Sequence, residues 1–494
     1  MKKSFKIAAL AMCAVICMAC GRKDEAPAVT ETVSQEQVPQ VTASVDKSVM
    51  TILQTVNSHA GQTTAQATES EEPVSSAPEG AEVIDLGNTS WYETETTTPV
   101  AGSDVSLNSS DRLDQLRELY ERHNFNEFDI HLMAVGDDLM HTGVTETGHM
   151  ADGTYNYDAL YADIAPYLAI ADIKVINQET IFGGDDKEFT SYPTFNSPTA
   201  MGDSIVRAGF NVVLQATNHI CDMGISGINY AYNFWKTSYP DLLVIGIYGE
   251  DGKSEDIPIL EIDGVKFAML NYTYGANWES LQSNLEYHTE MLTSWDPSSR
   301  KIDFNSLNPD VIDDIQRAEE IADVVVVFPH WGIEYQTTEN SYQDWVAKAM
   351  VEAGADLIVG THPHVPQPVK WIEADNGNKG LCYFSLGNYL STQYYPDTLL
   401  EAMAWVTFHV GYDGIEIVEE DTGVLPMVLQ YHTGPLRIDG VVAVENYTDE
   451  LAAAHGAPNR GGSYCGPDHF KTRSSEIFGD EWILTIDEIL AQGN

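Results

Sequence analysis

The sequence predicts an α/β fold, because strand-like and helix-like segments alternate along most of the chain. Short apolar runs bounded by turn residues, such as IHLMAVG (130–136) and DVVVVFP (323–329), have the length of buried strands. Amphipathic segments with helical spacing lie between such runs, as in SYQDWVAKAMVEAG (341–354). An Asp263-Gly264 turn between two further apolar runs predicts a β-hairpin in the second half.

The expected elements follow from these patterns in chain order. Strands are predicted at 130–136, 173–179, 211–217, 242–249, 257–274 (the hairpin), 323–329 and 356–361, with two or three more through 380–388 and 403–420. Helices are predicted at 157–172, 201–210, 224–238, 309–322, 341–354, 444–456 and 480–490. Loops are predicted at 275–308 and 459–472.

The first residues indicate export. Residues 1–20 combine a basic start, a short apolar run and the end CMAC, which resembles the signal of a bacterial lipoprotein with Cys20 as the lipid-modified residue. Cys17 stands where such signals usually carry Leu, so an ordinary cleaved signal is the alternative. We expect an exported protein, lipid-anchored at Cys20 on the outer face of the bacterial cytoplasmic membrane.

Composition divides the rest of the chain. Residues 21–108 are rich in Thr, Ser, Glu and Pro and predict a disordered acidic stalk. An amphipathic helix at 111–123 leads into a domain expected at 109–440, and 441–494 is expected to be a C-terminal extension that packs on this domain.

The chain is strongly acidic. Its formal net charge is −50, from 75 acidic and 25 basic residues. This charge argues against nucleic acid as a partner and against adhesion to an anionic membrane through charge. It would also repel an anionic polymer unless cations lie between the two.

Polar side chains with metal-ligand chemistry follow five of the predicted strands. In chain order they are Asp137 and Asp138; Asn177 and Glu179; Asn218 and His219; His330, Trp331 and Glu334; and His362 and His364. Because reactive groups in α/β folds lie just past the carboxyl ends of strands, we expect these residues to meet in one pocket. Such ligands suit divalent Mn, Fe or Zn, and a carboxylate can bridge two ions.

Taken alone, each motif has a structural alternative. The acidic pair after the first strand could form an Asx turn or cap a helix, and the Asn-His-x-x-Asp motif could be a helix N-cap network. The histidine after 323–329 could be a satisfied core residue. His362-Pro363-His364 is the hardest to explain this way, because alternate residues can turn two imidazoles toward one cavity.

Six motifs carry a resemblance to a known family: VGDDLMH, NQET, GFNVVLQATNHICDMGISGI, FPHWGIEY, GTHPHVPQPV and YFSLGN. In this order they resemble the motif series of the CapA / poly-γ-glutamate capsule biosynthesis proteins, over roughly 128–432. That family is similar in fold to the calcineurin-like metallophosphoesterases. The resemblance therefore implies a layered, metallophosphoesterase-like β-sandwich flanked by helices.

The resemblance also implies roles for the strand-end residues. It implies two groups of metal ligands that share Glu179 as a bridging carboxylate. The groups are completed by Asp137 and His364 on one side and by Asn218, His330 and His362 on the other. His219 would be the catalytic imidazole, oriented by Asp222 and placed to protonate a leaving oxygen or stabilise charge. Substrate contacts are expected from Asn177, Trp331, Glu334 and Asn388.

The motifs depart from the phosphoesterase pattern in the first segment. Leu139 stands where Asp-x-His would place a histidine two residues after Asp137, and Asp138 and His141 are the alternatives for the missing ligand. The bridging residue is Glu, and the residue directly after the histidine of the Asn-His motif is Ile220 instead of Asp. A one-metal site and a polymer-binding site without turnover thus remain alternatives.

The leading hypothesis is a surface-anchored protein of this family that acts in synthesis, transfer or processing of an anionic envelope polymer such as poly-γ-glutamate. One or two divalent metal ions would reverse the charge of the pocket locally. Expected partners are the polymer or its synthesis machinery and the membrane through the lipid anchor. The alternatives are an extracytoplasmic metallophosphoesterase and a non-catalytic factor for capsule assembly or export.

Overall fold

The computed structural model divides the chain into two units, residues 1–89 and 90–494. It describes residues 117–119, 123, 126–277, 285–296 and 301–493, all of them in the second unit. The expected signal peptide, the lipidation at Cys20 and the acidic stalk therefore lie outside the described residues. Of the amphipathic helix expected at 111–123, residues 117–119 and 123 are described; 117–119 are helical and 123 lies in a turn.

The first sheet has nine strands. They are β1 (Phe128–Asp138), β2 (Ile173–Asn177), β3 (Val212–Leu214), β4 (Leu243–Ile245), β13 (Asn388–Leu390), β14 (Leu400–Gly411), β15 (Gly414–Ile417), β16 (Gly423–His432) and β17 (Arg437–Ala443). Their order is β17-β16-β14-β1-β2-β3-β4, with β13 paired to β1 and β15 to β14. Strands β1 to β4 are parallel to one another, whereas β14 runs antiparallel to β1. The carboxyl ends of β1, β2 and β3 therefore meet at one edge.

The second sheet has six strands. They are β5 (Ile259–Ile262), β6 (Val265–Thr273), β9 (Val324–His330), β10 (Leu357–Val359), β11 (Val369–Glu373) and β12 (Lys379–Tyr383). Their order is β11-β12-β10-β9-β6-β5, with a parallel centre from β6 to β12. The predicted hairpin is confirmed, because Asp263 and Gly264 join β5 to β6 with φ values of 49° and 89°.

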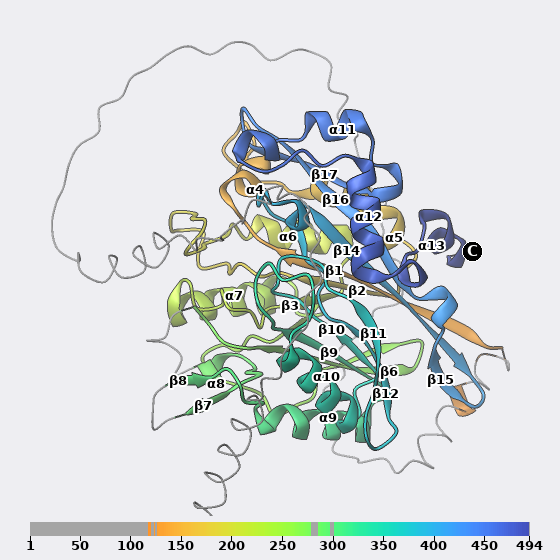
Figure 1. Ribbon diagram of the computed structural model, residues 1–494. Helices are drawn as coiled ribbons and strands as arrows, with labels where there is room; N and C mark the ends of the chain where they lie inside the picture. The colour runs from red at the N-terminus through yellow and green to blue at the C-terminus, as the bar shows by residue number, and fades with distance from the viewer. Residues whose placement is uncertain (1–116, 120–122, 124–125, 278–284, 297–300, 494) are drawn as a thin grey trace, which may run out of the picture. The chain divides into compact units, whose positions relative to one another are not determined.

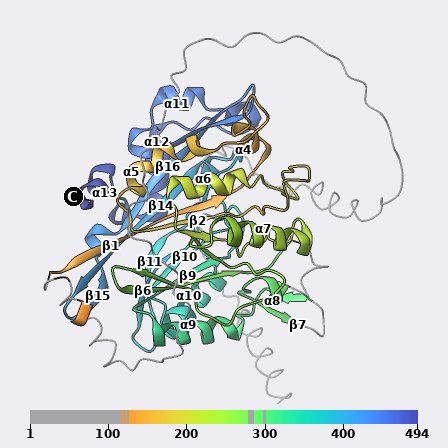
Figure 2. The same ribbon diagram turned by 180° about the vertical axis from the view of Figure 1, so that it is seen from behind.

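Helices cover the outer faces of both sheets. They are α4 (Thr142–Thr147), α5 (Ala165–Leu168), α6 (Ala200–Ala208), α7 (Gly224–Ser238), α8 (Leu285–His288), α9 (Pro309–Ile321), α10 (Ser341–Ala353), α11 (Asp449–Ala454), α12 (Pro467–Phe478) and α13 (Ile486–Gln492). Figures 1 and 2 show α9 and α10 against the second sheet, and α5, α6 and α12 on the side of the first.

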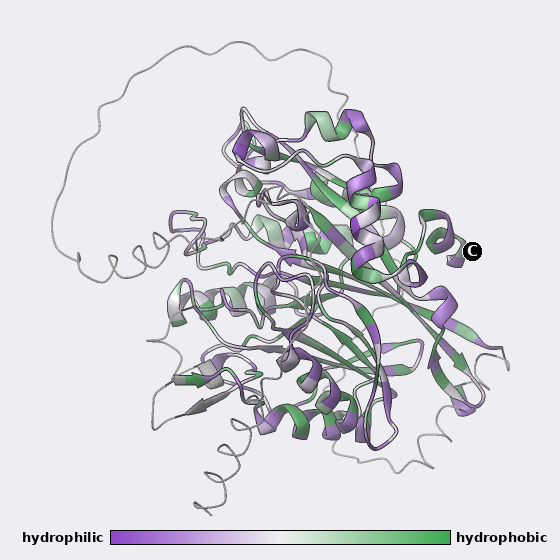
Figure 3. Ribbon diagram, viewed as in Figure 1, coloured by the Kyte–Doolittle hydropathy of each residue, from purple (hydrophilic) through white to green (hydrophobic). Residues whose placement is uncertain are grey.

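The two sheets pack face to face around a shared apolar core. Leu132 of β1 and Val326 of β9 belong to one buried cluster, and the rings of Phe267 and Phe408 meet edge to face across the sheets at 5.3 Å. Figure 3 shows the hydrophobic residues concentrated on these strands. This arrangement confirms the predicted layered α/β sandwich flanked by helices.

Three local predictions were wrong. The loop expected at 275–308 contains α8 and a small sheet of β7 (Ser294–Asp296) and β8 (Lys301–Asp303). These three elements are too short for their apolar residues to show a helical or strand period. Two or three last strands were expected through 380–388 and 403–420, whereas residues 369–443 contain seven, β11 to β17. The loop expected at 459–472 gives way to α12 at Pro467, because proline fits the first helical position.

The segment after residue 440 continues β17 and then forms the last three helices. Helix α12 packs on β16, and α13 packs on α5. Within the described residues, no helix combines the length and the apolar character that crossing a bilayer requires. Cys221, Cys382 and Cys465 are buried and carry free thiols.

Candidate metal centre

The carboxyl ends of strands from both sheets bring the expected ligand residues together. In the described part of the chain, two sets of side chains offer ligand atoms within 4.8 Å of one another: Glu179, His330 and His362, and Asp137, Glu179 and His364. All are buried, and Glu179 belongs to both sets. The structure thus gathers five of the six expected ligands into two groups around one carboxylate.

Glu179 lies at the centre of this cluster and is 1% exposed. Its Oε1 is 3.8 Å from Nε2 of His330, and its Oε2 is 3.8 Å from Nδ1 of His364. Neither oxygen has a hydrogen-bond partner. Burial, and next the charge of Asp137, raises the pKa of Glu179 well above its ordinary value. A carboxylate buried without partners is costly unless a cation compensates it.

Asp137 anchors the first group. Its Oδ1 accepts a hydrogen bond from Nδ2 of Asn177 at 2.7 Å, and its Oδ2 lies 3.1 Å from Nδ1 of His364. Strand β13 can lie against this end of β1 because Gly136 has no side chain, and a Cβ there would be 2.0 Å from the carbonyl oxygen of Gly387. The close approach brings Asn388, the first residue of β13, beside Asp137.

Imidazoles and one amide form the second group. Nε2 of His330 lies 2.8 Å from Oδ1 of Asn218, so the sixth expected ligand also lies at this group. Nδ1 of His330 lies 2.9 Å from Oγ1 of Thr361, while Nδ1 of His362 is buried without a partner. Burial, and next the neighbouring histidines, lowers the pKa of His330 and of His362 well below the usual range. Both rings are therefore neutral, which is the form that binds metals.

The backbone is strained at this site. Of the four non-glycine residues with positive φ in the described part of the chain, three lie here: Tyr335 at 66°, His362 at 99° and His364 at 59°. Such conformations cost on the order of 1–3 kcal/mol each and persist where the surrounding structure imposes them. The strain turns both imidazoles of the His-Pro-His motif toward Glu179.

His219 and Asp222 form a dyad beside the cluster. Nδ1 of His219 donates to Oδ2 of Asp222 at 2.7 Å, and the same oxygen accepts from the backbone N–H of Phe195 at 2.8 Å. Nε2 of His219 lies 4.0 Å from Oε1 of Glu179. The dyad therefore leaves one ring nitrogen directed at the cluster.

Asn277 is a site residue that sequence reasoning missed. Its Nδ2 lies 3.3 Å and 3.4 Å from the two ring nitrogens of His219, and its backbone N–H donates to the carbonyl of Asn218 at 3.0 Å. It falls in the segment expected to be a loop, and no motif surrounds it. Thr361 was also missed, although it directly precedes the His-Pro-His motif.

Asp138 and His141, the alternatives for the missing first-motif ligand, belong to neither group. Asp138 is fully buried, neither of its oxygens has a hydrogen-bond partner, and burial raises its pKa to about 8. Nδ1 of His141 accepts from the backbone N–H of Thr392 at 3.2 Å, and burial lowers its pKa to about 3. A neutral His141 with one nitrogen engaged lies near the cluster without joining it.

The residues expected to contact substrate fall into three environments. Asn177 and Asn388 are buried and orient other side chains. Asn177 donates a hydrogen bond to Asp137, and Oδ1 of Asn388 lies 3.2 Å from Nδ1 of His364. The expectation for Trp331 needs correction, because its ring is fully buried and its Nε1 donates to the carbonyl of Phe384 within the core. Glu334 is exposed, and its charge acts on Glu179 and Tyr274, so it lies near the cluster.

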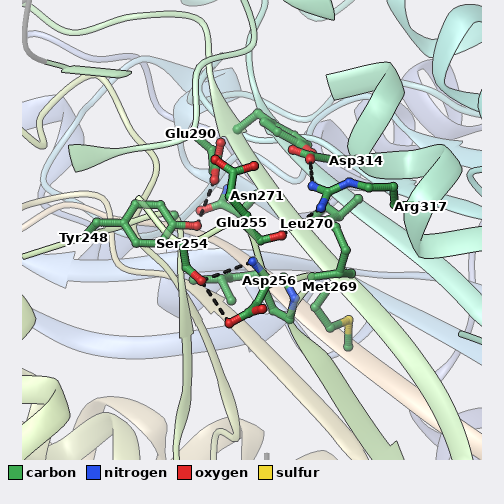
Figure 4. A pocket seen from close by; sticks show the side chains of 15 residues that line it. Tyr248, Ser254, Glu255, Asp256, Met269, Leu270, Asn271, Glu290, Asp314 and Arg317 are labelled. Carbon is green, nitrogen blue, oxygen red and sulfur yellow. Dashed lines mark hydrogen bonds and ion pairs between the residues drawn. The ribbon is translucent and has the colours of Figure 1, made fainter. Parts of the chain in front are cut away.

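A separate cavity of about 20 Å³ lies between the β5–β6 hairpin and α9 (Figure 4). Tyr248 donates to Glu290 there at 2.8 Å, and Arg317 pairs with Asp314. The cavity has room for about one water molecule. None of its lining residues belongs to the metal-ligand groups.

Comparison with known proteins gives two kinds of match. The model of the family described as bacterial capsule synthesis protein PGA_cap matches residues 131–393. The chain is 31% identical over 319 residues to the capsule biosynthesis protein CapA of Bacillus anthracis, which covers 63% of this chain and 69% of that protein. It is 28% identical over 284 residues to the PGA biosynthesis protein CapA of Bacillus subtilis (strain 168), covering 57% of this chain and 67% of that protein.

Among solved structures, the 5'-nucleotidase from Candida albicans SC5314 matches with a TM-score of 0.29 and 11% identity. The match covers 56% of this chain and 46% of the nucleotidase. Neither the fold nor the activity of the chain follows from a similarity at this level.

Proposed function

The chain belongs to the family of the bacterial capsule synthesis protein PGA_cap, and from this premise we propose that it synthesises, transfers or processes an anionic envelope polymer such as poly-γ-glutamate with the help of a divalent metal. The two Bacillus relatives are named for capsule and PGA biosynthesis. The reaction class is hydrolysis or transfer at an amide or ester bond of the polymer.

The observation that carries this proposal is the environment of Glu179. Its two unpartnered oxygens face different imidazole groups, and the charges that act on it come from other carboxylates, Asp137 first among them. The donor set of carboxylates, neutral imidazoles and an amide oxygen fits Mn, Fe or Zn. Asp137, Glu179 and His364 would hold one ion, and Glu179, Asn218, His330 and His362 would hold a second.

The residues of the dyad supply proton chemistry at the edge of this centre. A bound divalent ion would polarise an acyl or phosphoryl oxygen as a Lewis acid. Asp222 holds the proton of His219 on Nδ1 and stabilises the ring when it is charged, so Nε2 is the atom that gives a proton to the leaving group. Asn277 lies over the same ring and limits how it can rotate.

Charge supports the role of metal in binding a polyanion. The chain carries a net charge of −50, which disfavours an anionic polymer at long range. Divalent cations at the cluster would reverse the sign of the potential where the polymer reacts. The requirement for metal is therefore expected to extend to binding as well as to turnover.

Location is a further part of the proposal. The motif around Cys20 supports export and a lipid anchor on the outer face of the cytoplasmic membrane. Labelled palmitate should be incorporated by the wild-type protein and lost in Cys20→Ala. Equal labelling of both proteins would refute the anchor at this residue.

The test of the reaction compares three proteins purified without chelators: wild type, His219→Ala and, as control, His409→Ala, whose histidine pairs with Asp129 away from the cluster. With Mn, Fe or Zn, the wild type and the control should change the length of γ-linked glutamate oligomers. His219→Ala should bind metal normally but react about 10²–10⁴-fold more slowly.

A wild type that binds no metal, together with capsule assembly that tolerates His219→Ala, would favour a non-catalytic assembly factor. Selective turnover of phosphoesters would favour the phosphoesterase alternative.

A further inference from the structure

A row of aromatic rings leads away from the metal centre on the His364 side. The ring of Tyr335 lies 6.1 Å from that of His364 and 6.4 Å from that of Tyr395, and Tyr395 lies 4.9 Å from Tyr394. The guanidinium of Arg460 lies over the Tyr394 ring at 5.3 Å. We call these four residues, Tyr335, Tyr395, Tyr394 and Arg460, the tyrosine strip.

Two rings of the strip are open to solvent. Tyr335 is 50% exposed and Tyr395 is 56% exposed. Exposed rings that adjoin each other and a buried reactive centre are typical of a recognition surface.

The strip is held rigidly although its rings come from separate loops. The backbone N–H of Tyr335 donates to the carbonyl of Pro363 at 2.8 Å, which fixes its strained φ of 66°. Arg473 of α12 donates to both oxygens of Asp397, at 2.7 Å and 3.2 Å, and to Oγ1 of Thr337 at 2.9 Å. One arginine thus ties the loop of Tyr335 to the loop of Tyr395, so a ligand would not have to order them.

The strip also carries a cation in an acidic protein. Arg460 bonds to the carbonyl of Thr392, and its charge contributes to the lowered pKa of His141, so the guanidinium acts on the edge of the cluster. Glu334 is exposed beside Tyr335 and would repel anions. An anionic ligand is therefore expected to place its carboxylates toward Arg460.

We propose that the tyrosine strip binds a stretch of polymer chain beside the metal centre, so that the substrate is recognised as an extended chain of several residues. This inference depends on the proposed function. Each residue of a γ-linked polyamide offers a planar amide and methylene groups, which fit ring faces, and a carboxylate, which fits a guanidinium.

The test measures dissociation constants of the full-length, metal-loaded protein for free glutamate and for γ-linked glutamate oligomers of increasing length. The variants are Tyr335→Ala, Tyr395→Ala and Arg460→Gln. The control is Tyr412→Ala, whose ring is 50% exposed in the turn between β14 and β15. Metal content and circular dichroism verify that each variant is folded, and the two tyrosine variants provide independent tests.

Wild-type affinity should rise with oligomer length. Each variant of the strip should weaken binding of the long oligomers about two- to tenfold, leave the shortest ligands unchanged, and so flatten the dependence on length. If the wild type binds long oligomers and the variants bind them equally well, the strip is not the subsite, and the proposed function stands. If the wild type binds no oligomer of any length, both proposals are overturned.

Discussion

Nδ1 of His219 lies 2.7 Å from Oδ2 of Asp222, and this single contact determines which ring nitrogen faces the metal-ligand cluster. Because a carboxylate only accepts hydrogen bonds, the proton of the neutral ring is held on Nδ1. Nε2 is then directed toward Glu179, 4.0 Å away. The relationship separates the orienting role of Asp222 from the proton-transfer role of His219.

Asp222→Asn should therefore reduce turnover while leaving metal in place. The amide can present its N–H to the ring and favour the wrong tautomer, and general acid catalysis typically contributes about 10²–10⁴-fold. We expect a loss of about a hundredfold or more in kcat with unchanged metal content. Asp241→Asn, at an exposed carboxylate, is the matched control. Equal loss of metal and activity in Asp222→Asn would show that Asp222 supports the fold of the centre instead.

Thr361→Val should weaken metal binding without removing a ligand. Its Oγ1 lies 2.9 Å from Nδ1 of His330 and orients the ring whose other nitrogen points at Asn218. Loss of a partner that orients a metal-binding histidine typically costs about 10–100-fold in affinity. Competition with a chelating dye measures this change, with the exposed Thr338→Val as control. Unchanged affinity would mean that His330 does not depend on Thr361 for its orientation.

Glu401 predicts a pH dependence of stability that is independent of the metal centre. It is fully buried on β14, neither oxygen has a partner, and burial raises its pKa well above the ordinary value. Below the unfolded pKa of about 4.3, both states are protonated. As the pH rises from there toward the folded pKa, the unfolded state ionises first, so the wild type loses stability.

Glu401→Gln should remove this contribution. The free energy of unfolding of the variant should fall less steeply with pH than that of the wild type, by up to about 1.4 kcal/mol per pH unit. Denaturant titrations at a series of pH values measure both slopes, with the exposed Glu416→Gln as control. Parallel curves for wild type and Glu401→Gln would show that this carboxyl ionises normally.

Much of the site could be predicted because it follows from topology. The parallel strands β1, β2 and β3 end at one edge, and β9 ends opposite in the second sheet, so the polar residues after these strands had to converge. The strongly apolar strands and the Asp263-Gly264 turn likewise predicted the α/β alternation and the hairpin, whereas the family resemblance implied the layered sandwich. The hydrophobic period and the turn residues were sufficient to predict the strands, the helices and the hairpin.

Side-chain direction at irregular backbone could not be predicted. Asp137 reaches the cluster and Asp138 does not, because the pairing register of β1 shifts at these residues. A bulge of this kind leaves no clear sequence signal. Trp331 was misplaced for a related reason, since one residue after His330 the side chain turns into the core. Asn277 reaches His219 from a segment without periodicity, so only the structure identifies it.

The central claim is that Glu179 joins two groups of ligands into one metal centre, and elemental analysis tests it most directly. Wild type, Glu179→Gln and the control Glu416→Gln, whose carboxylate is exposed on β15, are purified without chelators and their Mn, Fe and Zn contents are measured. The account predicts bound divalent metal in the wild type and the control, and loss from both groups in Glu179→Gln, because the shared carboxylate is gone. A wild type without metal, or a Glu179→Gln protein that retains the full content, would contradict it.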